Sequence, residues 1–576
     1  MKSNSCEMPF DENDITQYNP LHNVLGINPK KRVREYTERL SYNKFEFIDT
    51  EGNKKTCFKK FITLVDYVKY LIGKYKPEEM NTLPCIENFN NKDNQFQEYI
   101  NSQHNYAYVD GFFYFLTSKL LKGGFVHGLD FYDNYVCLTK NCEINIADDF
   151  EYLSDSDFFN EHINKLFQFK DETFGNMFKK NVPISLSDET IEIEMDTLDD
   201  LEDDADKVDT NKVDTNKVVN EQHINPIVLA VETLDGGESE CSEKCESECN
   251  ETCETKTRES DTCESDTCEE LEEIMNNDSD ESTDSDHSTI DLSDSDNSDN
   301  ESDNNTEEWE TDDETNGESS EEDEIENLTL IVNKIPTQVV AIECCEVTFD
   351  SILEKNEIRI EELESAVFQI IAMLYLYQKA FKFTHNDLHT NNIMCITTKE
   401  EFLHYKIMGK YYKIPTYGRI YKIIDFGRAI YTVNGTVLCS DSFSENGTAH
   451  TQYNCEPFYN PKKPLIEPNY SFDLCRLSCS MVDFIVEDMR QLNNYRKVPV
   501  YDLIISWLYD DNGVNILYKK NGEERYPDFK LYKMIARLVH NHLPETQFSH
   551  ECFKKYETVT LEKCMDLDDI KNQVHL

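Results

Sequence analysis

The chain of 576 residues is poor in basic side chains and in long apolar runs. Only 56 Lys and Arg stand against 114 Asp and Glu, which gives a formal charge of −58 at pH 7. Phosphate binding needs basic surface, so we expect no direct nucleic-acid partner. The longest apolar stretch, Ala366–Tyr377, is interrupted by Gln369, and we expect no membrane span.

A secretory leader and a disulfide framework are also not expected. Residues 1–7 are polar and include Glu7, where a signal peptide would need an apolar core. Twenty cysteines in a chain of this length, several of them beside predicted core strands, indicate reduced thiols. We therefore expect an intracellular protein that is not secreted.

The negative charge is concentrated in one segment, residues 188–327, which holds 54 acidic and 6 basic side chains. Such a segment buries too little apolar area to offset its ordering entropy, and we expect it to be disordered. A solvated spacer, a soft-metal site and a target of acidophilic kinases are the three interpretations. The soft-metal site would use Cys241, Cys245, Cys249 and Cys253. The acidophilic kinases would phosphorylate Ser279, Ser282, Ser285, Ser293, Ser295, Ser298 and Ser302.

Hydrophobic periodicity on both sides of this segment predicts a mixed α+β protein. Residues 1–27 are polar and are expected to form a flexible arm. Strands are predicted as a hairpin over residues 45–61, at 125–130, at 135–138, at 337–343 and as a hairpin over 402–421. Helices are predicted over Tyr106–Leu121 and Glu361–Ala380, with mostly helical structure from Val498 to Tyr556.

Two short stretches carry the chemistry. The first, Phe383–Met394, reads Phe-Thr-His-Asn-Asp-Leu-His-Thr-Asn-Asn-Ile-Met, and the second, Tyr421–Gly427, is an apolar strand that ends in Asp-Phe-Gly. Phosphoryl transfer needs one carboxylate near the attacking hydroxyl and oxygen ligands for Mg²⁺, and both are available here. The alternative is a loop aspartate, a helix cap and an ordinary turn.

This pair of motifs resembles the catalytic loop and the metal-binding Asp-Phe-Gly of protein kinases. The resemblance implies that Asp387 orients or deprotonates the acceptor hydroxyl. It also implies that Asn392 holds one metal ion and that Asp425 holds metal bridging the phosphates. The offset of five residues from Asp387 to Asn392 matches the family. ATP and Mg²⁺ are the cofactors that follow.

Four further residues are assigned by their place along the resemblance. Lys59 and Lys60 point to opposite faces of a strand, and Lys60 is expected to bind the α- and β-phosphates, because Phe58 would then line the pocket beside it and Lys59 would be left to solvent. The alternative is that both lysines face solvent on an edge strand. Asp110 is the expected partner of Lys60, although an acid in a first helical turn also favours the helix dipole. Backbone groups from Glu343 to Cys345 are expected to contact adenine.

Other positions refine the family pattern or depart from it. Asp473 is expected to tether the catalytic-loop backbone, or only to cap its helix. Asn386 replaces the family arginine that reads a phosphorylated activation loop, so no such switch is expected. His389 is counted among the catalytic residues, because many protein kinases place a phosphate-neutralising lysine there; the alternative is that it only packs in the loop. Neither a Gly-x-Gly-x-x-Gly loop nor a convincing Ala-Pro-Glu is present.

The combination of Phe58–Phe61, Tyr108–Phe113, Thr384–Met394 and Arg525–His540 looks most like serine/threonine-protein kinases encoded by large cytoplasmic DNA viruses. This resemblance implies a two-lobed kinase-like α+β fold, with the acidic insertion in the N-lobe, in the host cytoplasm or the virion. The expected parts are an arm (1–27), the N-lobe (28–187), the insertion (188–327), the last N-lobe strand and hinge (328–347), the C-lobe (348–565) and a tail (566–576).

The expected function is ATP- and Mg²⁺-dependent transfer of the γ-phosphoryl group to a hydroxyl, by a serine/threonine-protein kinase of atypical sequence. Its partners would be ATP and a protein substrate, for which basic proteins suit the acidic insertion. One alternative is a small-molecule phosphotransferase on the same fold, suggested by His389 and the missing Ala-Pro-Glu. The other is a pseudokinase scaffold that captures basic proteins, suggested by the missing Gly-rich loop.

Overall fold

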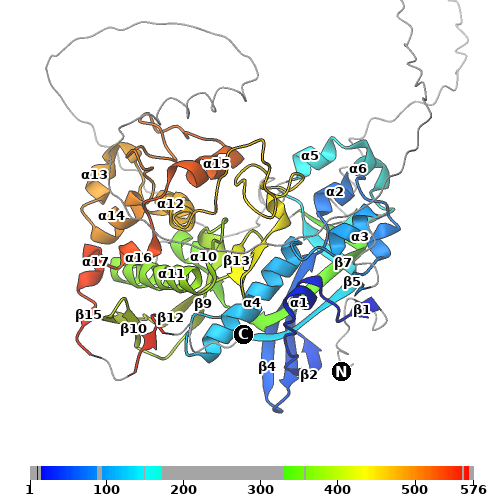
Figure 1. Ribbon diagram of the computed structural model, residues 1–576, viewed down its shortest axis with the longest axis horizontal. Coiled ribbons are helices and arrows are strands. Elements are labelled where there is room, and N and C mark those ends of the chain that lie inside the picture. The colour runs from blue at the N-terminus through cyan, green and yellow to red at the C-terminus, as the bar shows by residue number, and fades with distance from the viewer. Residues whose placement is uncertain are drawn as a thin grey trace, which may run out of the picture. The chain divides into compact units, whose positions relative to one another are not determined.

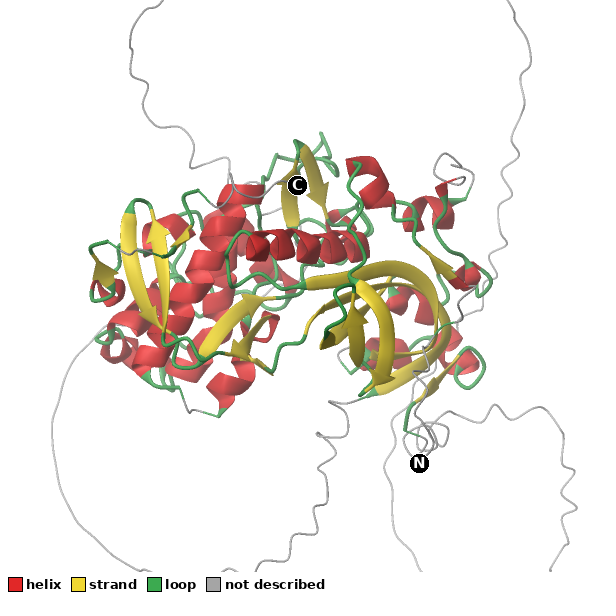
Figure 2. Ribbon diagram, turned by 90° about the horizontal axis from the view of Figure 1, so that it is seen from below, coloured by secondary structure: helices red, strands yellow, loops and turns green. Residues whose placement is uncertain are grey.

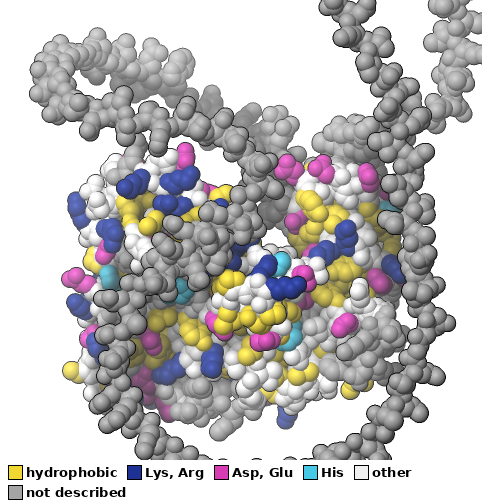
Figure 3. All heavy atoms as spheres, turned by 45° about the horizontal axis from the view of Figure 1, so that its top comes forward, with side chains coloured by type: hydrophobic (Ala, Val, Ile, Leu, Met, Phe, Trp, Pro, Cys, Tyr) yellow, Lys and Arg dark blue, Asp and Glu magenta, His cyan; other side chains and the backbone are white. Residues whose placement is uncertain are grey.

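The computed structural model describes residue 10 and residues 14–86, 94–147, 149–171, 328–355, 358–560 and 563–569. They belong to one compact unit, made from Met1–Ser185 and Asn316–Leu576. The predicted disorder of residues 188–327 lies outside the described residues. Charged side chains of both signs are interspersed with apolar ones on the face drawn in Figure 3, as the charge balance outside that segment predicts.

The N-terminal part is built on one antiparallel sheet of order β1-β5-β7-β4-β3-β2, with β6 on β7. Figure 2 shows this sheet strongly curled. Strand β7 pairs with β5 on one side and with β4 on the other, which joins segments that are far apart in the sequence. The strands are β1 (Ile15–Thr16), β2 (Val33–Arg39), β3 (Lys44–Asp49), β4 (Lys54–Thr63), β5 (Phe131–Asn145), β6 (Phe167–Phe169) and β7 (Thr329–Glu343).

The main helix on this sheet is α4 (Tyr106–Lys122), which packs on β7 and is covered by α1 (Figure 1). Gly111 makes the close approach possible, since a Cβ there would lie 1.8 Å from Gln338 Nε2. Nearly all of α4 is buried, which explains its mostly apolar sequence. The other helices here are α1 (Pro20–Leu25), α2 (Tyr67–Leu71), α3 (Gln95–Ile100), α5 (Phe150–Ser154) and α6 (Asp157–His162).

The predicted hairpin over residues 45–61 is confirmed as β3 and β4, and the helix over Tyr106–Leu121 as α4. The flexible arm is wrong for the described residues 14–27, which form β1 and α1. Leu21 of α1 is fully buried and Asn19 caps this helix. The strand at 125–130 is also wrong: these residues form turns, and Gly128 lies so close to α4 that a Cβ would be 2.2 Å from the Thr117 carbonyl oxygen.

The C-terminal part is mainly helical around the buried helix α11 (Ile360–Phe381), as predicted. The segment from Val498 to Tyr556 is less helical than expected, because residues 507–528 form turns and isolated bridges. The remaining helices are α10 (Phe349–Glu354), α12 (Phe472–Ile485), α13 (Leu492–Tyr495), α14 (Pro499–Ser506), α15 (Phe529–Leu538), α16 (Pro544–Gln547) and α17 (Glu551–Lys554).

Small sheets complete the C-terminal part. The predicted hairpin over 402–421 is confirmed as β10 and β11, with β12 directly after it, so the mixed α+β class holds for the described residues. No helix in the described ranges is both long and apolar enough to cross a membrane. The strands are β8 (Val347–Thr348), β9 (Ile393–Thr397), β10 (Phe402–Ile407), β11 (Lys410–Pro415), β12 (Arg419–Ile423), β13 (Ile430–Val433), β14 (Thr436–Cys439), β15 (Glu557–Thr558) and β16 (Met565–Asp566).

A buried histidine joins the turn after α4 to the C-terminal strands. His127 Nδ1 lies 2.9 Å from the Tyr421 carbonyl oxygen, and its Nε2 lies 2.7 Å from the Tyr405 hydroxyl. A neutral ring satisfies both contacts, with one nitrogen donating and the other accepting. Burial lowers the pKa of His127 to about 3.

We expect the free energy of unfolding to fall as the pH drops from about 6.5 to about 3, because the unfolded chain then binds a proton that folded His127 excludes. The contribution of one such histidine is about 1.4 kcal/mol per pH unit. The free energy of unfolding is measured with urea at a series of pH values and plotted against pH. The slope of this plot should be smaller by this amount in His127→Asn. His404→Asn, at a partly exposed position of β10, is the control; equal slopes in all three proteins would contradict the prediction.

Candidate active site

The first motif forms a loop that a buried aspartate holds in place. Asp473, in the first turn of α12, accepts hydrogen bonds from the backbone N–H groups of His385 (2.9 Å) and Asn386 (2.8 Å). Its side chain is fully buried. The prediction that Asp473 tethers this loop is therefore confirmed, and the alternative of a surface helix cap is wrong.

Asn386 has a structural role in the same loop. Its φ of 65° lies in the left-handed region, which asparagine tolerates better than most residues. Its side-chain amide donates to the Arg428 carbonyl oxygen at 2.9 Å and accepts from the Tyr453 hydroxyl at 2.9 Å. The absence of a phosphorylation-dependent switch at this position stays a prediction.

The structure brings Asp387, His389 and Asn392 together. Asn392 Nδ2 donates to the Asp387 carbonyl oxygen at 2.9 Å and lies 3.0 Å from His389 Nε2. Burial lowers the pKa of His389, so its ring is neutral at neutral pH and Nε2 can accept this hydrogen bond. These contacts turn the amide nitrogen of Asn392 toward the loop and leave its oxygen as the atom suited to a metal ion.

Lys60 joins two acids from different parts of the chain. Its Nζ lies 2.9 Å from Asp110 Oδ2 on α4 and 3.0 Å from Asp425 Oδ1, directly after the β12 segment. The backbone continues the link: the Phe426 N–H donates to Asp110 Oδ1 at 2.5 Å, and the Asp425 N–H donates to the Tyr114 hydroxyl at 3.0 Å. Asp110 thus lies in the position predicted for the partner of Lys60.

The two acids of this cluster differ in exposure and charge. The Asp110 side chain is 1% exposed, and burial raises its pKa to about 6 in spite of Lys60. The Asp425 side chain is 50% exposed; burial works to raise its pKa, but Lys60 outweighs this and lowers it to about 2. Burial alone would lower the pKa of Lys60, yet the two carboxylates raise it well above its ordinary value. Lys60 is therefore a cation, and Asp425 is an accessible anion beside it.

Aromatic rings place the Asp-Phe-Gly segment against the first loop and α4. Phe426 is buried, with its ring centroid 4.6 Å from Phe113 of α4 and 5.7 Å from His385. Phe113 also stacks on Phe383 at 4.4 Å. Because this packing fixes both sides of the segment, Asp425 and Asp387 are carried by one common core.

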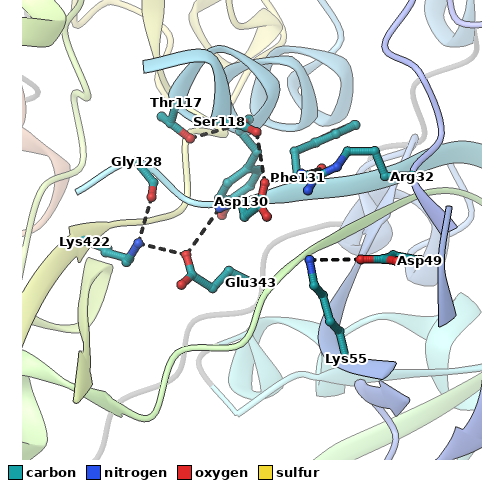
Figure 4. A network of polar contacts seen from close by, with 11 residues as sticks. Arg32, Asp49, Lys55, Thr117, Ser118, Gly128, Asp130, Phe131, Glu343 and Lys422 are labelled. Carbon is teal, nitrogen blue, oxygen red and sulfur yellow. Dashed lines mark hydrogen bonds and ion pairs between the residues drawn. The ribbon is translucent and has the colours of Figure 1, made fainter. Parts of the chain in front are cut away.

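The end of β7 is tied to β12 by a polar network (Figure 4). Lys422 Nζ lies 2.8 Å from Glu343 Oε2 and 2.7 Å from the Gly128 carbonyl oxygen, and its side chain is 1% exposed. The Glu343 N–H donates to the Asp130 carbonyl oxygen at 2.8 Å. The Glu343 N–H therefore bonds to the protein itself, and adenine contacts by the Glu343 carbonyl and the backbone of Cys345 stay a prediction.

One residue of the N-terminal sheet, Lys59, differs from expectation. Lys59 is fully buried rather than turned to solvent, with Nζ 3.3 Å from the Tyr36 ring centroid and 4.1 Å from that of Phe45. Cation–π contacts with these rings offset the desolvation of the ammonium.

In the turn between β2 and β3, Tyr42 packs on Phe61. Strand alternation places Phe61 on the face of β4 opposite Lys60. This turn stands where a Gly-rich loop would precede the hairpin.

The side chain of Asp387 has two partners that sequence reasoning missed. The Tyr532 hydroxyl of α15 donates to Asp387 Oδ1 at 2.7 Å, and Arg428 Nη1 lies 3.4 Å from Oδ2. Arg476 Nε donates to the same Tyr532 hydroxyl at 3.0 Å. The sequence around a tyrosine on a short amphipathic helix does not indicate such a distant contact. The segment Arg525–His540 was singled out only because it resembles the viral kinases.

The donor set fits Mg²⁺. A carboxylate from Asp425 and an amide oxygen from Asn392 are hard oxygen ligands, and Mg²⁺ in phosphate sites takes one or two protein ligands besides phosphates and water. No group of three or more His, Cys, Asp or Glu side chains suited to a metal ion occurs among the described residues. A site that depends on the bound nucleotide for its remaining ligands is consistent with both observations.

Comparison with known proteins supports a partial protein-kinase-like relationship. No family model matches the chain. One similar protein is serine/threonine-protein kinase haspin from Bos taurus, with 33% identity over 89 residues. The match covers 16% of this chain and 11% of haspin, so it concerns a small part of either protein.

Proposed function

We propose that this chain is an ATP- and Mg²⁺-dependent phosphotransferase with a two-lobed kinase-like fold, and that it acts as a serine/threonine-protein kinase. In this proposal the curled sheet with α4 forms the N-lobe, and residues 348–565 form the C-lobe. The partial similarity to haspin, which is named a serine/threonine kinase, supports the same class of reaction.

The observation that carries the proposal is the bridge from Lys60 to Asp110 and Asp425. A partly buried lysine between two acids has a structural use on its own, but here one acid is half exposed and follows the strand predicted to lead into a metal ligand. Asp387 and Asn392 lie in a loop that packs on the same Phe426. A cation for phosphates, a metal-binding acid and a carboxylate for the acceptor are thus present together.

Each residue then has a defined task. Lys60 positions the α- and β-phosphates, while Asn392 and Asp425 would hold Mg²⁺, which when bound neutralises charge on the phosphate oxygens. Asp387 accepts the proton of the acceptor hydroxyl as its oxygen attacks the γ-phosphorus and the bond to the ADP oxygen breaks. His389 keeps the amide of Asn392 oriented, so we assign it a positioning role.

A non-catalytic nucleotide-binding scaffold is the second candidate. The position of Tyr42 favours this candidate. Tyr42 contacts Phe61 on the face of β4 opposite Lys60, so this residue of the turn does not cover the phosphates. A protein of this kind would bind Mg-ATP without transferring phosphate.

The test is transfer of labelled γ-phosphate from Mg-ATP into the chain itself, a basic protein mixture and a small-molecule hydroxyl set. We expect transfer by the intact chain and a decrease on the order of 10²- to 10⁴-fold in Asp387→Asn. Asp483→Asn is the matched control, since Asp483 also accepts a tyrosine hydroxyl, from Tyr518 at 2.8 Å, on the exposed end of α12. No transfer by any variant, with retained Mg-ATP binding, would favour the scaffold instead.

A further inference from the structure

The hydroxyl of Tyr532 lies where an acceptor hydroxyl would have to lie. It donates to Asp387 Oδ1 at 2.7 Å, and Asp387 is the carboxylate that the proposed function assigns to the acceptor. A group that takes a proton must come within hydrogen-bond reach of the hydroxyl that loses it. One oxygen of Asp387 is thus occupied by a hydroxyl from the chain itself.

The phenol of Tyr532 is firmly held in this place. Arg476 Nε donates to its oxygen at 3.0 Å, and the guanidinium carbons of Arg476 and Arg428 lie 5.1 and 5.7 Å from the ring centroid. The Phe529 ring stacks on it at 5.5 Å. Burial and the charge of Asp387 raise the pKa of Tyr532, so the hydroxyl stays protonated and continues to donate at neutral pH.

The helix that carries Tyr532 is most deeply buried in its second half. Only Ile535 and Ala536 of α15 are buried, and both lie beyond Tyr532. Asn469 Nδ2 donates to the Val539 carbonyl oxygen at 2.5 Å, just after the helix. Residues 519–524, further upstream, are exposed, and Phe529, Leu531 and Tyr532 are only partly buried where they pack on the core. A movement of the Tyr532 side chain therefore breaks few fully buried contacts.

We propose that Tyr532 occludes the acceptor site, because its phenol competes with the acceptor for Asp387. The inference rests on the proposed function and goes beyond it. An acceptor reaches the carboxylate only when the Tyr532 side chain moves away, which breaks its hydrogen bonds to Asp387 and Arg476. Only molecules in which Tyr532 has left Asp387 can bind an acceptor there, so the apparent affinity for acceptors is scaled down to that fraction of molecules.

The experiment measures the acceptor KM and kcat with myelin basic protein as the probe, for wild type, Tyr532→Phe and Tyr532→Leu. Removal of the hydroxyl should lower the acceptor KM on the order of tenfold, the scale of one hydrogen bond to a charged group. The kcat and the KM for ATP should change little. Tyr518→Phe removes the hydroxyl that donates to Asp483 and is the matched control, with unchanged constants.

This inference alone would be overturned by transfer with the same acceptor KM in wild type and Tyr532→Phe, by a raised KM, or by phosphate on Tyr532 in digests of wild type. The last would make Tyr532 a substrate of Asp387 rather than a competitor. Unfolding of Tyr532→Phe, Asp387→Asn and the double variant tests the contact without activity, and additive effects would also overturn it. No transfer by any variant would overturn the proposed function, and this inference with it.

Discussion

Replacing Asp425 by asparagine is expected to abolish phosphotransfer. The pKa of Asp425 is about 2, so the substitution removes a full negative charge at any working pH. Asparagine keeps the size of the side chain but is a poorer ligand for Mg²⁺, which supplies much of the charge neutralisation in phosphoryl transfer. We expect a decrease on the order of a thousandfold or more in the initial rate at saturating Mg-ATP.

A second readout separates loss of metal binding from loss of folding. Mg-ATP should raise the melting temperature of the intact chain and of Asp483→Asn, but much less that of Asp425→Asn. Asp425→Asn should itself fold, because Asp110 still pairs with Lys60 and Phe426 still packs on Phe113. Transfer by Asp425→Asn at the rate of the intact chain would refute the role of Asp425 and weaken the whole proposal.

The second large effect is expected for Lys60→Met. This substitution removes the cation that the proposal assigns to the phosphates and leaves the buried carboxyl of Asp110 without its partner. Loss of a preorganised charge at a reacting phosphate is expected to lower kcat/KM on the order of a hundredfold to a thousandfold. The measurement is the same labelled-phosphate assay over a range of ATP concentrations.

Lys59→Met is a closely matched control. Lys59 is adjacent in β4, but it is fully buried and lies among Tyr36, Phe45 and Tyr135 on the other face. We expect it to lose stability and to keep phosphotransfer. Equal losses of activity in the two variants, at equal stability, would contradict the assignment of Lys60.

The pH dependence of stability checks Lys60 without any activity. The pKa of Asp110 is already raised by burial to about 6, and loss of Lys60 would raise it further. The folded state would then bind a proton that the unfolded state releases above about pH 4. Folded wild type already holds this proton below about pH 6, so the stability of Lys60→Met relative to wild type should fall as the pH rises above about 6, as measured by urea unfolding.

Local pattern predicted much of the fold and part of the site. Alternation and turn residues predicted the hairpin of β3 and β4, and helical spacing predicted α4 and α11. Strand alternation predicted that only one of Lys59 and Lys60 faces the site, and the structure places Lys60 beside Asp110, although Lys59 is buried and not turned to solvent. These predictions succeeded because each depends on neighbours within a few residues along the chain.

Other predictions failed where contacts outweighed local preference. Residues 125–130 have apolar side chains typical of a strand, but they form turns. Gly128 lets these turns pack closely against α4. Lys59 has the charge of a surface residue, but three aromatic rings surround its ammonium. No sequence window contains these neighbours, since they come from other strands and helices.

The amino-acid sequence alone determined the motifs: the spacing of Asp387 and Asn392, the Asp-Phe-Gly at Asp425, and the lysine that precedes them on a strand. Only the tertiary structure decided which groups face one another. Strand β7 pairs with both β4 and β5, Lys60 joins Asp110 to Asp425, and Tyr532 reaches Asp387 across 145 residues. The physical reason is that covalent spacing sets local conformation, whereas hydrogen bonds and ion pairs between distant segments depend on how the whole core packs.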